Sequence, residues 1–344
     1  MLLKSNLRLL RDQLDRLAET PYFSSELDAY IRVIRDALDA LLGKLAGSLP
    51  TINDDVARFI AAEVWRLTQF LTGSTAKQIP YEVVYAIQEA VREWGTTNLL
   101  VTTAIVQDAN FYFHSSPSDF FNLVESELGV TIRSRPVQIA LPYVYRHKPL
   151  FCVPLFHELG HFVDACNDIV TTSLLSSPGG VGPDLPDLKP SSEIAKLSGM
   201  EKQWWEDIVR RHRMEYFADL VSVAYVGRAA LGFLQEFIPS APMQPSHPSS
   251  TARFKLMLDF INGTPNPVLD LFQDALACRG LPPLSRRYQS VGVEQAFANV
   301  RPCQLNSSQE IFGLFESGWV FLQEMAKNPR GLWANLSEPE IERI

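Results

Sequence analysis

Apolar residues recur at helical spacing through the first 75 residues. In the first run they step by four and three, at Leu3, Leu7, Leu10, Leu14 and Leu17. A second run with the same spacing, 27–45, lies beyond Pro21, and a third, 56–71, follows a cap at Asn53 or Asp54. This periodicity predicts three amphipathic helices, the first two forming a hairpin. Their stripes would either pack on the chain's own body, as most such stripes do, or form an arm that dimerises or binds a regulatory protein.

The pattern changes after Pro80. A further helix is predicted at 81–94, and then β-branched residues take over in 99–106, which predicts a strand. A second strand is predicted at 137–141, continuing to residue 145. Helical spacing dominates the rest of the chain. We therefore predict an α+β fold that is mainly helical, with a small β-sheet and helical N- and C-terminal regions.

Two segments rich in proline and serine interrupt the second half. The first, 171–192, also carries two adjacent glycines, so we predict a flexible insertion without regular structure, either a lid or a surface loop. A long helix is predicted from Ser192 past residue 215, and the second loop covers 239–250. The remainder, 255–344, is predicted to be mostly helical.

Composition and charge narrow the functional classes. The chain has 344 residues, 46% of them hydrophobic and 20% charged, which is typical of a globular protein. A net charge of −8 argues against nucleic-acid binding. No apolar run approaches the roughly 18 residues of a membrane span, and charged residues come too early for a secretory signal. A reducing, cytoplasmic location is expected from the few scattered cysteines, Cys152, Cys166, Cys278 and Cys303.

The motif His157-Glu158-Leu159-Gly160-His161 lies in apolar sequence. On a helix beginning near 148–149, with Pro154 in its first turn, the two histidines share one face and can bind one Zn²⁺. Glu158 would then stand beside the metal, where it can take a proton from water. The leucine and glycine between the histidines are expected to keep the helix slim enough to pack against a sheet. Two core histidines bonded to backbone carbonyls are the alternative, which leaves the glutamate unexplained.

A third ligand is needed for catalytic zinc. The metzincin spacing fails, since Asp164 and Asn167 stand where glycine and histidine would be required; Asp164 is expected to orient a ligand or to be solvated. Glu215 and Asp219, four residues apart in an apolar segment, are better candidates. Glu215 would complete a His₂Glu site and Asp219 would accept the outer N–H of a ligand histidine.

These residues resemble a known family. The first motif, followed by Glu215-x-x-Ala218-Asp219 and by His247-Pro248-Ser249-x-x-x-Arg253, resembles the gluzincin metallopeptidases, in particular the family of HtpX and the CAAX prenyl proteases. The resemblance covers about residues 150–256. Members of that family usually carry transmembrane helices beside the catalytic core, and none is predicted in this sequence. It implies a zincin-like catalytic core, with His247 and Arg253 as candidates for stabilising the oxyanion.

The resemblance further implies an edge strand that binds extended substrate, which we expect near 137–145. We predict three regions: an N-terminal helical region, 1–78; the catalytic core, 79–262; and a C-terminal helical region packing on the core, 263–344. The predicted function is zinc-dependent endopeptidase action on a protein or peptide.

Two other functions stay open. The N-terminal helices could bind a second protein that controls the protease, so that the isolated chain is almost inactive. The zinc could instead be a structural plug in a non-catalytic binding protein, with Cys152 or Cys166 as its fourth donor.

Overall fold

The computed structural model describes residues 2–22, 24–46, 51–95, 99–108, 110–176, 183–238, 240–292, 296–297 and 301–327. Two compact units divide the chain: the first comprises Met1–Gln88 and Thr96–His147, the second Glu89–Gly95 and Lys148–Ile344. This division differs from the predicted boundaries after residues 78 and 262. The reason is that the sheet shares a hydrophobic core with the N-terminal helices, in which Leu100 is buried.

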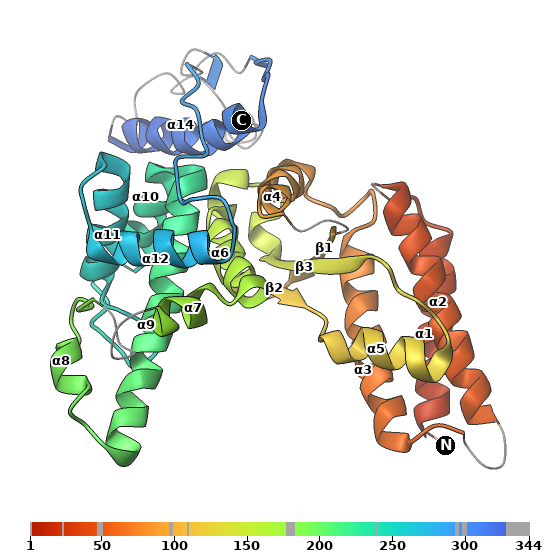
Figure 1. Cartoon of the computed structure of the whole chain (residues 1–344). Helices are drawn as coiled ribbons and strands as arrows, with labels where there is room; N and C mark the ends of the chain where they lie inside the picture. Colours follow the sequence, from red (N-terminus) through yellow and green to blue (C-terminus); the bar gives the residue numbers. More distant parts are fainter. Residues whose placement is uncertain are drawn as a thin grey trace. The chain divides into compact units, whose positions relative to one another are not determined.

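The first unit is built on the helices that the leucine stripes predict (Figure 1). Its helices are α1 (Leu2–Ala18), α2 (Ser25–Ala46), α3 (Asp54–Gly73), α4 (Tyr81–Glu93), whose last turns belong to the second unit, and α5 (Ser118–Leu128). Asn53 caps α3 by accepting the N–H of Asp55. The stripes are buried together in one core, so most of their apolar surface is used inside this unit. The periodicity of the sequence predicted α1, α2, α3 and α4, but it did not predict α5.

A small sheet completes the first unit. Within the described residues it has three strands in the order β1 (Leu99–Val106), β3 (Arg135–Pro142), β2 (Tyr112–Ser115). β1 runs parallel to β3, and β2 runs antiparallel to it. The substrate-binding edge strand expected near 137–145 is therefore wrong, because β3 is central and both its edges are paired. Residues 143–145 form the 3₁₀ turn η1 (Tyr143–Tyr145) instead.

In the described part of the second unit the regular elements are all helices, and they are joined by loops; one of these, 281–292, lies in the C-terminal region that was predicted to be helical. The unit contains the 3₁₀ turn η2 (Pro149–Cys152) and the helices α6 (Pro154–Asn167), α7 (Ile169–Leu175), α8 (Ser191–Ile194), α9 (Gly199–Val226), α10 (Arg228–Phe237), α11 (Ser250–Asn262), α12 (Pro267–Cys278) and α14 (Ser308–Lys327). The expectation that 171–192 lacks regular structure is wrong at both its ends, where α7 and α8 lie; 177–182 fall outside the described residues. Apolar residues such as Ile169, Val170 and Ile194 give these short helices a buried face.

Aromatic side chains hold the second unit around α6. The ring of Phe156 stacks on Tyr225 of α9 and meets Phe312 and Phe315 of α14 edge-on. α14 thus packs on both α6 and α9. None of the described helices has both the length and the apolar composition that a membrane span requires.

Candidate metal centre

Helices α6 and α9 approach so closely that only small residues fit between them. A Cβ added to Gly160 would lie 2.4 Å from the Cα of Ala218. Gly160 stands between the two histidines of α6, and Ala218 stands between Glu215 and Asp219 of α9. The expectation that this glycine packs against a sheet is therefore wrong: it packs against a helix. The close crossing brings two pairs of polar side chains together in an otherwise apolar interface.

Replacing Gly160 with alanine should force these helices apart. We expect Gly160→Ala to cost about 1–3 kcal/mol in unfolding free energy, because overpacking displaces backbone rather than a flexible side chain, and to weaken metal binding. Gly43→Ala in α2 is the matched control, since nothing lies within 4 Å of its added Cβ. It should stabilise by about 0.5–1 kcal/mol. Thermal unfolding and zinc titration check both; equal stability of the two variants would contradict the close crossing.

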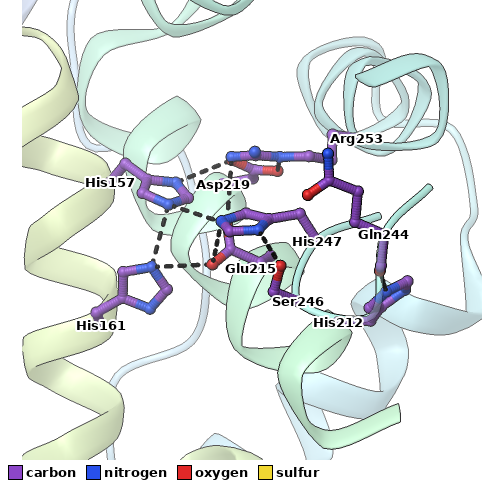
Figure 2. Close-up of polar contacts among 9 residues, drawn as sticks. All are labelled: His157, His161, His212, Glu215, Asp219, Gln244, Ser246, His247 and Arg253. Carbon is purple, nitrogen blue, oxygen red and sulfur yellow. Dashed lines mark hydrogen bonds and ion pairs between the residues drawn. The ribbon is translucent and has the colours of Figure 1, made fainter. Parts of the chain in front are cut away.

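Three donor side chains converge at the crossing (Figure 2). The Nε2 atoms of His157 and His161 are 3.1 Å apart. Glu215 Oε2 lies 3.4 Å from Nε2 of His157, and its Oε1 lies 3.5 Å from Nε2 of His161. Ligands at about 2.0–2.1 Å from a tetrahedral zinc are about 3.3 Å from one another. The donor types and their separations therefore fit zinc, and these three residues are the group that could hold a metal ion among the described residues.

Two further charged side chains, Asp219 and Arg253, contact this cluster. Asp219 Oδ1 lies 2.9 Å from Nδ1 of His157, so the ring is oriented with Nε2 toward Glu215 and His161. Arg253 on α11 donates two hydrogen bonds to Asp219, from Nε and Nη2, each 2.7 Å long. The same guanidinium lies 3.6 Å from Glu215 Oε2. Asp219 and Arg253 are both buried, so each charge is compensated by the other.

The charges of the cluster follow from these contacts. Burial lowers the pKa of His157, but its bonds to Asp219 and Glu215 outweigh burial and raise the pKa to about 9. Burial and the charge on His157 lower the pKa of His161 to about 4. Burial raises the pKa of Glu215, but His157 and Arg253 reverse this and bring the pKa to about 2. At pH 7, the metal-free cluster thus carries one imidazolium, one neutral imidazole and one carboxylate.

The remaining predicted residues of the motifs lie around this cluster. Glu158 follows His157 on α6 and is half-buried. His247, in the loop before α11, is half-exposed and points Nε2 toward Glu215, 3.5 Å from Oε1. Its other ring nitrogen, Nδ1, lies 2.9 Å from Ser246 Oγ. The structure therefore brings His247 and Arg253 close to the Glu215 side of the cluster.

Three residues considered from the sequence lie elsewhere. Asp164 is neither solvated nor bonded to a ligand histidine: it is buried and accepts the N–H of Val170 at 2.7 Å, joining α6 to α7. Neither Cys152 nor Cys166 belongs to the metal-binding group of the described residues. Among the described residues, neither cysteine is therefore placed to be the fourth ligand of the structural zinc that was considered from the sequence.

His212, one turn before Glu215 on α9, was missed. It is fully buried, and its Nε2 lies 2.7 Å from the backbone carbonyl oxygen of Gln244, in the loop that carries His247. A signal was present in the sequence. His212, Glu215 and Asp219 are spaced i, i+3, i+7, which places three polar side chains on one stripe of a largely apolar helix.

Comparisons with protein-family models, with curated proteins and with solved structures return no match to this chain.

Proposed function

We propose that this chain is a zinc-dependent endopeptidase of gluzincin type. The observation that carries the proposal is the convergence of His157, His161 and Glu215 at separations suited to one tetrahedral zinc. Three protein ligands with a fourth position open are typical of catalytic zinc, whereas structural sites have four. Neither His247 nor a cysteine joins these three in the metal-binding group of the described residues, which favours the catalytic type.

Each residue then has a distinct task. A zinc ion in this site would supply Lewis acidity, which polarises a peptide carbonyl and makes water a stronger acid. Glu158 accepts a proton from the attacking water as the new C–O bond forms, and passes it to the amine nitrogen when the C–N bond breaks. His247 donates a hydrogen bond from Nε2 to the carbonyl oxygen as negative charge develops there. Asp219 keeps His157 oriented, and Arg253 keeps Asp219 charged.

The proposal predicts metal-dependent cleavage. Purified chain loaded with zinc should hydrolyse members of a random-sequence peptide library, with new N-termini detected by mass spectrometry. Removing the metal with a chelator should abolish cleavage, and added zinc should restore it, because the metal supplies most of the activation of water. Cleavage that continues after complete zinc removal would contradict the proposal, as would a zinc-loaded chain that cleaves no peptide.

A further inference from the structure

The loop before α11 has no helix or strand in its described residues. Three prolines, Pro242, Pro245 and Pro248, occupy every third position and have no backbone N–H to donate. Within the described loop, Gln244 N–H donates to the His247 carbonyl at 2.8 Å and His247 N–H donates to the Gln244 carbonyl at 3.2 Å, while Ser250 N–H closes the loop by donating to the Ala241 carbonyl at 3.0 Å. The position of His247 therefore depends on the Gln244 carbonyl.

This same carbonyl is held from α9. Nε2 of His212 lies 2.7 Å from the Gln244 oxygen, and since a carbonyl can only accept, Nε2 carries the proton and donates it. The Gln244 oxygen thus accepts two hydrogen bonds, one from His212 (Figure 2) and one from the backbone of His247. His212 is fully buried whereas Gln244 is exposed, so the hydrogen bond is shielded from competing water on the side of its donor. Burial also lowers the pKa of His212, which favours the neutral ring.

The C-terminal end of the loop is fixed separately. Ser249 caps α11 by accepting the N–H of Ala252 at 3.2 Å, and its hydroxyl also donates to Asp187. Between this anchor and the Gln244 carbonyl, the loop presents His247 with Nε2 3.5 Å from Oε1 of Glu215. Glu215 lies one turn after His212 on the same helix, so one helix carries both a metal-binding candidate and the anchor of the opposing loop.

We propose that His212 is a positioning residue that acts through the Gln244 carbonyl to hold His247 over the Glu215 side of the cluster. Because His212 and Glu215 lie one turn apart on α9, this helix then sets the distance between Glu215 and His247 through the side chain of His212. The anchoring stands independently of the proposed function; its catalytic consequence rests on the peptidase proposal.

Two substitutions that differ by one methylene group isolate this bond. The side-chain amide of His212→Gln places an N–H near the position of Nε2, whereas that of His212→Asn is too short to reach Gln244. Both are polar, so a difference between them reports the donor and not the loss of a polar group. His114→Asn in the first unit is the control for replacing a histidine elsewhere; in the native protein this ring contacts Arg66 at 2.8 Å.

Amide hydrogen exchange over 243–250, followed by mass spectrometry, tests the anchoring without any activity assay. We expect His212→Asn to speed exchange in this segment by at least about tenfold, with α6 and α9 unchanged, and His212→Gln and His114→Asn to match the wild type. Unchanged exchange in His212→Asn would overturn the proposal. Equal acceleration across the whole second unit would also overturn it, because His212 would then support the fold and not the loop.

A double-mutant cycle on kcat/KM tests the catalytic consequence. Alone, His212→Asn should lower kcat/KM about tenfold with zinc content unchanged; in a His247→Ala background it should have no further effect. If the effects of the two substitutions on kcat/KM multiply instead, His212 does not act through His247. If no peptide is cleaved by the wild type, the peptidase proposal fails while the exchange result still decides the anchoring.

Discussion

Glu158→Gln should lower peptide hydrolysis by about three orders of magnitude or more while leaving zinc bound. The substitution keeps the size and shape of the side chain but removes the proton acceptor, so attacking water is no longer deprotonated and the leaving amine is not protonated. Glu158 lies outside the metal-binding group, so the cluster of His157, His161 and Glu215 stays intact. Steady-state kinetics together with metal analysis checks both halves of the expectation.

Glu127→Gln in α5, the same substitution in the other unit, controls for the chemical change alone and should leave activity and zinc unaltered. A Glu158→Gln protein that hydrolyses peptides at the wild-type rate would show that the base lies elsewhere. One that loses zinc would make Glu158 a supporter of the metal site instead of the base.

Arg253→Ala should be among the most destabilising single changes in the second unit. It leaves the buried carboxylate of Asp219 without its two charge-assisted hydrogen bonds, and breaking such a pair typically costs about 3–5 kcal/mol. For a unit of this size, the melting temperature should fall by on the order of 10 °C. Zinc affinity should fall in parallel, because Asp219 orients His157. Thermal unfolding and zinc titration follow the two effects.

Arg253→Lys separates charge from geometry. Lysine keeps a positive charge but cannot donate the paired bonds of a guanidinium, so its stability should lie between wild type and alanine. The resemblance offers a different role for Arg253, that of stabilising the oxyanion. A variant that keeps its melting temperature and zinc but loses about 10²–10³ in kcat would support that role and contradict the structural one.

The helices of the first unit could be predicted because burial imposes a repeat on the sequence. Leu7, Leu14 and Ile34 recur at helical spacing and are completely buried. The same logic predicted β1 and β3, whose residues are β-branched and apolar. It could not predict the order of the strands, because a run such as 137–141 has the same composition whether its strand is central or at an edge. The order depends on pairing with β2, a short strand that carries little signal.

At the candidate site too, the contacts within one helix could be predicted from the sequence, whereas the contacts between distant segments could not. Spacing of four residues placed His157 beside His161, and Glu215 beside Asp219, since each pair lies on one helix. The contact of Gly160 with Ala218 joins segments far apart in sequence and becomes visible only when α6 and α9 are placed together. For the same reason, the role of His212 depends on a loop about thirty residues away, at Gln244.

Zinc titration of the metal-free chain at pH 7, with heat and proton release recorded together, tests the central claim most directly. We expect one zinc per chain and release of at least about one proton, because the pKa of His157 is about 9 and that of His161 about 4, so of the two histidines only His157 must lose a proton to bind. The contribution of His157 to the proton count should disappear as the pH rises through 9, leaving only the proton lost by water on the zinc. Glu215→Ala should bind zinc far more weakly, since one of three protein ligands is gone. Full-affinity binding of one zinc by Glu215→Ala would contradict the account.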